Sequence, residues 1–430
     1  MNPLYLNDKP GEYPQSYYAA TTELPAERPS LEEDIQVDLA IVGAGYTGLS
    51  TAIHAAEKGL SVAVVEAHRA GFGASGRNGG QVGFGWNKDQ PWLERRFGKE
   101  DARKLWDLTL EAKALTRDLV GKYAPEAEYK PGVFQAETTD KGADEAAEYA
   151  RWLQDNLDFQ VEVVNREAAR EICRTDAYAG GFIDWDAGHL HPLRYVTGLA
   201  RGAEAAGVKI FERTEAIGIS EGRVETAKGV IRAEKVVLAG NGYLPDLNKQ
   251  IAERVMPINS FIAATEPLGD RAAEVLAKDI AVADDKFVVN YYRLSGDKRL
   301  LFGGRENYSL GFPKDITGEL EKRIANLFPQ IAGVGIDYHW GGTLGITMHR
   351  LPMLRQVMPG VFAAGGFSGH GVALTGLAGK ILAEAVTGDA ERFDLWRKLP
   401  TPRFPGGAAA RAPLLTLAMT WYSLRDRLGI

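Results

Sequence analysis

Three glycines with G-x-G-x-x-G spacing, Gly43, Gly45 and Gly48, follow an apolar run at residues 37–42 and open a helical pattern. Such glycines allow a tight turn and let the backbone approach a pyrophosphate, which the positive end of the following helix attracts. Glu66 ends the next apolar run, where a carboxylate can accept hydrogen bonds from the hydroxyls of a ribose. The combination predicts a dinucleotide site, because a glycine turn that served helix packing alone would leave the position of Glu66 unexplained.

A second glycine-rich segment, GFGASGRNGG at residues 71–80, comes directly after Glu66 and leaves the same edge of the predicted sheet. Its five glycines, with Ser75, Arg77 and Asn78, would line a ligand with backbone N–H groups and one cation. A simple NAD site needs no such second loop. A longer, flat, anionic ligand such as FAD fits the segment, and a flexible surface loop is the alternative.

A third glycine-rich segment, Gly366 to Gly371, follows an apolar run at residues 361–366 and precedes a helical pattern. The N-terminus of that helix would bring partial positive charge to a flavin ring and stabilise its reduced, anionic form. His370 lies inside the segment. It either supplies a proton or charge there or is a packed neutral ring that bonds to backbone, and the sequence favours neither.

Periodicity predicts the elements that must hold these segments. Residues 37–65 predict strand, helix and strand with a right-handed crossover, and residues 92–123 predict an amphipathic helical excursion from the sheet. Three short runs within residues 208–230 predict an antiparallel meander. Residues 254–338 alternate strand-like pieces with a helix near residues 317–328, and we expect this block to form a second domain.

Composition limits the class of protein. The 430 residues are 45% hydrophobic and 25% charged, which is ordinary for a folded globular chain of more than one domain. A net charge of -7 argues against a nucleic-acid partner. The single cysteine and the lack of a leader pattern indicate the cytoplasm, and the apolar tract at residues 413–422 is too short to span a bilayer. No metal-ligand cluster and no G-x-S-x-G elbow is present in the sequence, so metal catalysis and hydrolysis are not expected.

The glycine segments together resemble the D-amino-acid-oxidase superfamily of FAD enzymes. The resemblance rests on GAGYTG (43–48), Glu66, GFGASGRNGGQ (71–81), LAGN (238–241) and GGFSGHGVALTGLAGKILAE (365–384). A narrower likeness to the γ-glutamylputrescine oxidases rests on GHLHP (188–192), YYRL (291–294), DYHWGG (337–342), GDAERFD (388–394), FPGG (404–407) and SLRDRLGI (423–430). The likeness spans nearly the whole chain.

The resemblance implies an α/β plus α+β fold, in which an antiparallel-sheet substrate domain is inserted into a glutathione-reductase-like Rossmann FAD domain. The implied parts are an N-terminal arm (1–34), the FAD-binding domain (35–91, 180–245 and 339–395), the substrate domain (92–179 and 246–338) and a C-terminal segment (396–430).

The expected FAD contacts come from all three glycine segments and from two strand ends. They are Gly43, Gly45, Tyr46, Thr47, Gly48, Glu66, Ala67, Gly73, Ala74, Ser75, Arg77, Asn78, Gly79, Gly80, Gln81, Gly240, Gly366, Phe367, Ser368, Gly369, His370, Gly371 and Val372.

Four residues are expected near the reacting atoms: His370, Tyr292, Trp340 and His191. Alternation along the strand at residues 291–294 would send one tyrosine toward the flavin and its neighbours away, with core packing as the alternative for Tyr292. Trp340 would form an aromatic wall. His191 has either a structural role or a seat near the substrate.

Arg350 would clamp a carboxylate or the flavin, or form a surface salt bridge. Some relatives attach FAD covalently through a cysteine or histidine. Cys173 lies outside the FAD segments, and Arg77 and Asn78 stand where a related dehydrogenase group places its attachment histidine. Non-covalent FAD is therefore expected.

The implied activity is FAD-dependent oxidative deamination of a γ-glutamylated polyamine, with a small-molecule amine and dioxygen as reactants and aldehyde, ammonia and hydrogen peroxide as products. One alternative is an FAD-dependent amine or D-amino-acid dehydrogenase that passes electrons to a quinone at the membrane surface. Another is a flavin-binding scaffold or redox sensor. The sequence does not indicate an oligomeric state.

Overall fold

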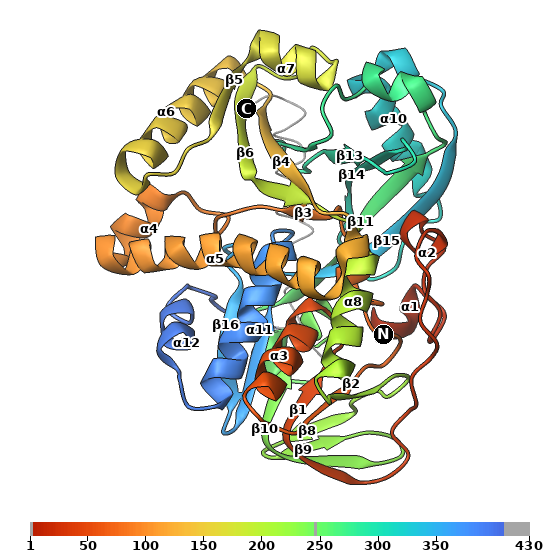
Figure 1. Cartoon of the computed structure of the whole chain (residues 1–430), viewed down its shortest axis with the longest axis vertical. Coiled ribbons are helices and arrows are strands. Elements are labelled where there is room, and N and C mark those ends of the chain that lie inside the picture. Colours follow the sequence, from red (N-terminus) through yellow and green to blue (C-terminus); the bar gives the residue numbers. More distant parts are fainter. Residues whose placement is uncertain (1–2, 245–246, 408–430) are drawn as a thin grey trace.

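A parallel sheet forms around the first apolar run of the sequence. In the computed structural model, which describes residues 3–244 and 247–407, strand β1 (Ile35–Val42) pairs in parallel with β2 (Val62–Val65) and β10 (Val230–Leu238). Strand β2 and the C-terminal ends of β1 and β10 are buried on both faces, which is why these parts are continuous apolar runs. The sheet fills the lower half of Figure 1.

The complete sheet has the order β16-β17-β10-β1-β2-β7, with a hairpin of β8 and β9 attached to β10. The remaining strands are β7 (Lys209–Phe211), β8 (Gly218–Ser220), β9 (Arg223–Glu225), β16 (Met353–Met358) and β17 (Val361–Gly365). The meander predicted for residues 208–230 is only half correct. Strands β8 and β9 form an antiparallel hairpin, but β7 pairs in parallel with β2, because the helix before it makes a crossover connection.

Helices α3 (Tyr46–Glu57), α8 (Pro192–Ala205) and α11 (Val372–Val386) lie over one face of this sheet, and α5 (Lys99–Tyr123) crosses above it and packs on α8 and α11 (Figure 1). Helices α3 and α11 approach closely, since the hydroxyl of Ser50 donates to the carbonyl oxygen of Gly376 at 2.6 Å. The close packing fixes the N-termini of the two helices relative to each other.

The second sheet has the order β15-β11-β14-β13-β12-β4-β6-β3, with β5 paired to β6. Its strands are β3 (Gln81–Val82), β4 (Lys130–Glu137), β5 (Glu162–Asn165), β6 (Gly180–His189), β11 (Met256–Thr265), β12 (Ala281–Asp284), β13 (Tyr291–Leu294), β14 (Leu300–Asn307) and β15 (Ile336–Ile346). All pairs are antiparallel except β4 with β12, which is parallel. A mixed Rossmann-type sheet and a second, largely antiparallel sheet confirm the predicted fold class.

The other helices lie around the second sheet or at the periphery. They are α1 (Pro3–Leu6), α2 (Tyr17–Ala20), α4 (Gln90–Phe97), α6 (Asp140–Leu157), α7 (Arg166–Cys173), α9 (Lys249–Ala252), α10 (Thr317–Leu327) and α12 (Glu391–Trp396), with 3-10 turns η1 (Ala74–Gly76), η2 (Pro125–Ala127), η3 (Asn241–Tyr243), η4 (Gly269–Glu274) and η5 (Pro329–Ile331). Thr139 and Asn165 begin α6 and α7 by accepting hydrogen bonds from backbone N–H groups of the first turn.

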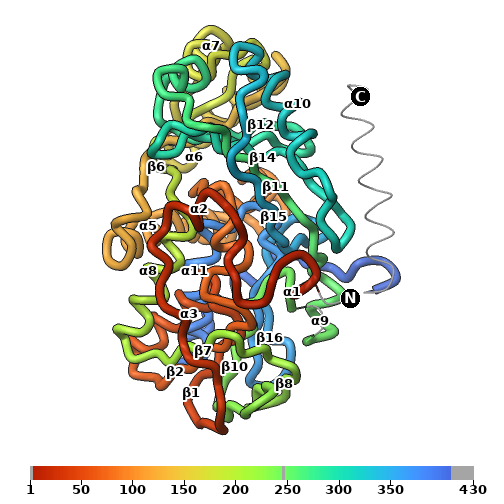
Figure 2. Tube along the Cα trace, turned by 90° about the vertical axis from the view of Figure 1, so that its right-hand side faces the viewer, coloured from red at the N-terminus to blue at the C-terminus, as the bar shows by residue number. Residues whose placement is uncertain are grey.

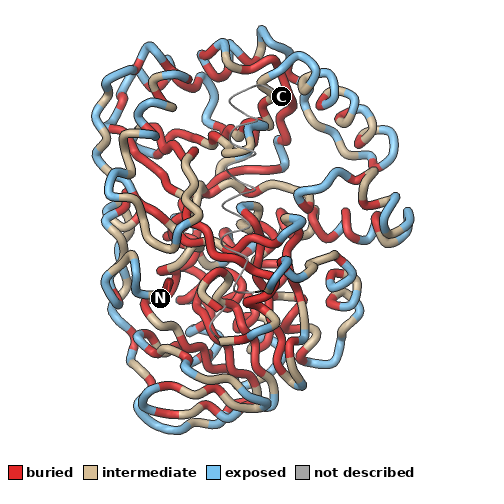
Figure 3. Tube along the Cα trace, turned by 180° about the vertical axis from the view of Figure 1, so that it is seen from behind, coloured by how far each residue is buried: buried red, intermediate tan, exposed pale blue. Residues whose placement is uncertain are grey.

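The predicted domain bounds remain a proposal, and they do not follow sheet membership. Strand β6 and all but the first three residues of β15 fall in segments assigned to the FAD domain but pair in the second sheet. Helix α5 falls in a segment assigned to the substrate domain but packs against α8 and α11. Buried residues continue from one sheet to the other without a break (Figure 3).

Residues 3–34 form an arm over the outside of both sheets, shown as the red tube in Figure 2. Within residues 3–244 and 247–407, no helix is both long and apolar enough to cross a membrane. The apolar tract at residues 413–422 lies outside the described part of the chain.

Candidate functional site

A cavity of about 630 Å³ is lined by residues of both sheets. It brings together the three glycine segments and most of the residues predicted to bind a cofactor. Those that line it are Gly43, Gly45, Tyr46, Thr47, Glu66, Ala67, Gly73, Ala74, Ser75, Arg77, Asn78, Gly79, Gly80, Gln81, Gly240, Phe367, Ser368, Gly369, His370, Gly371 and Val372.

Gly48 and Gly366 support the cavity from behind. A Cβ atom on Gly48 would lie 1.9 Å from the carbonyl oxygen of Gly43, so this position tolerates only glycine. Gly366 has a φ of +71° and donates its N–H to Asn241 Oδ1 at 2.9 Å. Both residues therefore shape turns that line the cavity, and neither needs to contact a ligand itself.

The first glycine turn presents a helix N-terminus to the cavity, and its N-cap residue has no side chain to cap it. Gly45 is the N-cap of α3 and supplies no side-chain cap. Ser75, from the second glycine segment, accepts a hydrogen bond from the N–H of Tyr46 at 3.0 Å. A Cβ on Gly45 would lie 2.8 Å from the Ser75 hydroxyl oxygen. The two glycine segments are thus in direct contact and form one concave wall suited to an anion.

Glu66 holds its carboxylate at the end of β2 with two backbone hydrogen bonds. The N–H groups of Ala44 and His68 donate to it at 2.9 and 3.1 Å. Burial raises the pKa of the Glu66 carboxyl, and these hydrogen bonds act in the opposite direction. The side chain lines the cavity beside the first glycine turn, as its spacing in the sequence requires for contact with a ribose.

Arg77 does not offer a free cation to the cavity. Its Nη1 donates to both carboxylate oxygens of Asp8 at 3.0 Å and to the carbonyl oxygen of Gly341 at 3.1 Å, while Nε donates to the carbonyl oxygen of Phe72 at 2.6 Å. Only Nη2 is buried without a hydrogen-bond partner among the described residues. No local pattern in the sequence could reveal this pair, because Asp8 belongs to the N-terminal arm.

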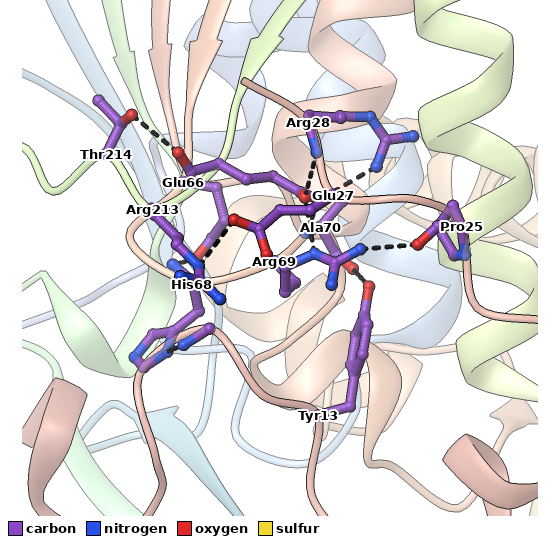
Figure 4. Close-up of polar contacts among 12 residues, drawn as sticks. Tyr13, Pro25, Glu27, Arg28, Glu66, His68, Arg69, Ala70, Arg213 and Thr214 are labelled. Atoms are coloured by element: carbon purple, nitrogen blue, oxygen red, sulfur yellow. Dashed lines mark hydrogen bonds and ion pairs between the residues drawn. The ribbon is translucent and has the colours of Figure 1, made fainter. Parts of the chain in front are cut away.

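A network of buried charges fastens the arm to the loop after Glu66. Glu212, whose side chain is fully buried, accepts hydrogen bonds from the N–H groups of Arg28 and Ala70 at 2.9 and 2.8 Å. The Arg28 and Arg69 guanidinium groups also donate to it, at 3.0 and 2.7 Å. Figure 4 shows Arg69 reaching the carbonyl oxygen of Pro25 as well. The arm is therefore part of the wall that positions Glu66.

His68 forms hydrogen bonds with the arm at two points. Its Nδ1 accepts from the N–H of Gly11 at 3.0 Å, and its Nε2 donates to the carbonyl oxygen of Leu4 at 2.8 Å. Leu4 lines the cavity, so the two His68 hydrogen bonds hold the arm against the end of the cavity near Glu66. Tyr13 adds a hydrogen bond to the carbonyl oxygen of Ala70 at 2.8 Å (Figure 4).

The two His68 hydrogen bonds to the arm should stabilise the protein less in mild acid. Burial lowers the pKa of His68, since the neutral ring must accept the Gly11 hydrogen bond through Nδ1. Its contribution to folding is therefore complete above the unfolded-state pKa of about 6.5 and declines as pH falls toward the lower folded-state pKa. The comparison is the difference in free energy of unfolding between the wild type and His68→Gln. We expect this difference to be larger at pH 7.5 than at pH 5.5 by about 1 kcal/mol. Urea unfolding at both pH values measures this difference, and a constant difference would contradict it.

The opposite end of the cavity lies against the second sheet. Tyr291 and Ser260 face it, with their hydroxyl oxygens 3.3 Å apart. His370 donates from Nε2 to the carbonyl oxygen of Phe84 at 2.7 Å, and burial lowers its pKa, so the ring is neutral. Gly371, the N-cap of α11, provides no side-chain cap. A second helix N-terminus therefore meets the cavity at this end.

Tyr292 does not reach the cavity. Strand alternation sends Tyr291 to the cavity face and Tyr292 to the opposite face, where its ring stacks on Phe302 and meets Phe328 edge-on. The choice of Tyr292 as the inward tyrosine was therefore wrong, because the sequence fixes the alternation but not which face meets the cavity.

Trp340 and His191 also lie outside the cavity lining. Trp340 donates from Nε1 to the carbonyl oxygen of Arg77 at 2.9 Å and packs against Tyr18. His191 caps α8, accepting the N–H of Arg194 through Nδ1 at 3.3 Å. Trp340 thus supports the second glycine segment, and His191 takes the structural role that the sequence left open, which corrects the catalytic assignment of both residues.

Several lining residues went unnoticed as site residues in the sequence. Asn241 holds the third glycine segment through Gly366, and Glu306 places a carboxylate in the cavity. Asn241 has a φ of +48°, and an asparagine directly after Gly240, which follows a strand, was the signal available for it. Glu306 carried no local signal, because only the pairing of β14 with β11 aims it at the cavity.

Known proteins match this chain over most of its length. The family model DAO, described as "FAD dependent oxidoreductase", matches residues 38–385. Gamma-glutamylputrescine oxidoreductase of Escherichia coli K12 is 38% identical over 424 residues, covering 97% of this chain and all of the relative. A probable oxidoreductase OrdL of Rhizobium meliloti is 40% identical, covering 96% and 97%.

Solved structures match the fold. The crystal structure of glycine oxidase from Geobacillus kaustophilus has a TM-score of 0.68 at 24% identity and covers 83% of this chain and 98% of its own. L-proline dehydrogenase from P. horikoshii has a TM-score of 0.67 at 21% identity and covers 87% and 98%.

Proposed function

Because the chain belongs to the DAO family of FAD-dependent oxidoreductases, we propose that it oxidises the primary amine of a γ-glutamylated polyamine such as γ-glutamylputrescine. The observation that carries the proposal is the full-length likeness to gamma-glutamylputrescine oxidoreductase of Escherichia coli. The products would be an aldehyde, ammonia and hydrogen peroxide, with water and dioxygen consumed.

The cavity fits FAD. In the proposal the N-terminus of α3 and Ser75 hold the pyrophosphate, Glu66 holds a ribose, and the N-terminus of α11 lies at the isoalloxazine ring. The two helix N-termini with glycine at the N-cap and the glycine positions that a Cβ would fill support this placement. When bound, FAD supplies the two-electron oxidation, and dioxygen takes up the electrons.

The residues of the chain would bind and orient the amine and exclude water. Burial raises the pKa of Tyr291, so its hydroxyl stays protonated and forms a neutral wall beside Ser260. The His370 ring is held in place by Phe84. Orientation of the reacting C–H bond, rather than a side-chain base, is the contribution that this wall makes.

The proposal includes non-covalent binding of FAD and a cytoplasmic location. Burial raises the pKa of Cys173 to about 12, and the thiol lies in the core of the second sheet, away from the cavity. Acid precipitation should therefore release all the flavin into the supernatant. One buried, unpaired cysteine suits a reducing compartment.

Anaerobic mixing with γ-glutamylputrescine tests the activity. We expect the flavin absorbance to bleach in the presence of the substrate and to return on admission of air, with hydrogen peroxide formed in equal amount. A quinone analogue that reoxidises the flavin faster than dioxygen would instead identify a dehydrogenase. A yellow protein that no primary amine bleaches would contradict the proposal.

A further inference from the structure

The cavity carries a cation that no described residue neutralises. Arg350 follows β15, lines the cavity, and is half-buried. Its guanidinium group makes no hydrogen bond or ion pair with any residue in ranges 3–244 and 247–407, and it lies 5.3 Å from the ring centroid of Phe287. Of the other two arginines in the lining, Arg77 is paired with Asp8, and Arg305 donates to the carbonyl oxygens of Asp315 and Ile316. Arg350 is thus free to bind an anion, and Arg305 is engaged.

A carboxylate lies within the electrostatic reach of this cation but is not paired with it. Glu306 lines the cavity from β14, opposite Ser260 on β11. Its carboxylate accepts a hydrogen bond from the Tyr308 hydroxyl at 2.6 Å. Burial raises the pKa of Glu306, and the hydrogen bond from Tyr308 and the charge of Arg350 act in the opposite direction. The positive charge of Arg350 and the negative charge of Glu306 both face the cavity and are not paired with each other. Such a pair of charges is complementary to a zwitterionic ligand.

One short segment anchors both Arg350 and His370. Asn87 Nδ2 donates to the carbonyl oxygen of Arg350 at 3.0 Å, and the carbonyl oxygen of Phe84 accepts from His370 at 2.7 Å. Phe84 and Asn87 are three positions apart in the sequence, so their Cα atoms are at most about 11 Å apart. Arg350 and His370 are therefore both held against residues 84–87.

We propose that Arg350 and Glu306 bind the α-carboxylate and the α-ammonium group of the glutamyl moiety, and so select a γ-glutamylated amine over the free diamine. This inference rests on the proposed function. A free diamine has no anionic group, so its binding would leave the Arg350 guanidinium unpaired in a partly desolvated site. That unpaired charge would weaken binding of the diamine. Phe287 is a positioning residue, because the ring beneath the guanidinium restricts where it can point.

Binding of a non-oxidisable ligand tests the assignment apart from catalysis. γ-Glutamylbutylamide keeps the charged moiety but has no terminal amine to oxidise. Three analogues complete the set: glutarylbutylamide lacks the ammonium group, 4-aminobutanoylbutylamide lacks the carboxylate, and butanoylbutylamide lacks both. Titration of FAD-loaded enzyme, followed by calorimetry or by the flavin spectrum, gives each dissociation constant.

Arg350→Gln should weaken binding of the two carboxylate-bearing ligands by about 30-fold, the size of one charge-assisted contact, and leave the other two within about threefold. Glu306→Gln should do the same for the two ammonium-bearing ligands. Arg350→Lys should fall between, since lysine keeps the charge but loses the bidentate fork. Arg223→Gln, on the distant hairpin, is the matched control and should change nothing.

Flavin content and the urea midpoint of each variant confirm that it is folded. Equal weakening of all four ligands, or no weakening, would overturn the inference. If the wild type binds γ-glutamylbutylamide through Arg350 yet γ-glutamylputrescine does not bleach the flavin, the proposed function fails and the charge assignment stands. If γ-glutamylputrescine bleaches the flavin equally well in wild type and Arg350→Gln, only the assignment fails.

Discussion

Replacing Gly48 with alanine should yield a protein that purifies without FAD. The added Cβ would lie 1.9 Å from the carbonyl oxygen of Gly43 and 3.1 Å from its carbonyl carbon, so the turn must open or the helix must shift. Either change moves the N-terminus of α3 away from the pyrophosphate it is proposed to hold. We expect the affinity for FAD to fall by about 100-fold or more, the equivalent of about 3 kcal/mol. The ratio of flavin to protein absorbance, followed by titration with added FAD, measures the loss.

Gly121→Ala provides the matched control. Gly121 lies within α5 with no atom within 4 Å of an added Cβ, and its exposed position leaves the fold unaffected. Alanine there should preserve FAD binding and stabilise the helix by about 0.5–1 kcal/mol. A Gly48→Ala protein that retained its full complement of flavin would show that the turn does not carry the cofactor.

Glu212→Gln should destabilise the protein by about 3–5 kcal/mol, because it leaves Arg28 and Arg69 buried around a neutral amide. The Glu212 side chain is fully buried and accepts four hydrogen bonds, so its charge is stabilised by these donors and not by solvent. The free energy of unfolding in urea measures the effect. Because the same network holds the loop after Glu66, the variant should also lose FAD more readily on dilution.

The matched control is Glu225→Gln, which removes the same charge from an exposed pair with Arg223. Its side chains are about half exposed, and surface pairs of this kind contribute little, so the change should be below about 0.5 kcal/mol. Equal effects of the two substitutions would mean that the buried network does not stabilise the arm.

The convergence of the glycine segments was predictable because parallel strands end at one edge of a sheet. Val42, Leu238 and Gly365 end three neighbouring strands, and the polar and glycine residues that follow them all line the cavity or support it. Strand polarity and glycine spacing are local properties of the sequence. The cofactor end of the site therefore follows from short stretches of sequence read one at a time.

The substrate end did not follow in the same way. Alternation at Tyr291 and Tyr292 predicts opposite faces, but which face meets the cavity depends on the pairing of β13 with β14. Glu306 is aimed by its register with Ser260, and Arg77 is neutralised by Asp8 from the arm. These outcomes depend on contacts between distant parts of the chain, which periodicity does not report.

The arm also constrains the order of events during folding. It is synthesised before the partners it binds in the body, and their hydrogen bonds to it span from 44 residues, between Pro25 and Arg69, to 305 residues, between Asn7 and Phe312. Loops of that length close late, after the body they wrap has formed. We therefore expect the arm to dock only after most of the chain has been synthesised, and a fusion tag placed on the arm to interfere with that late step.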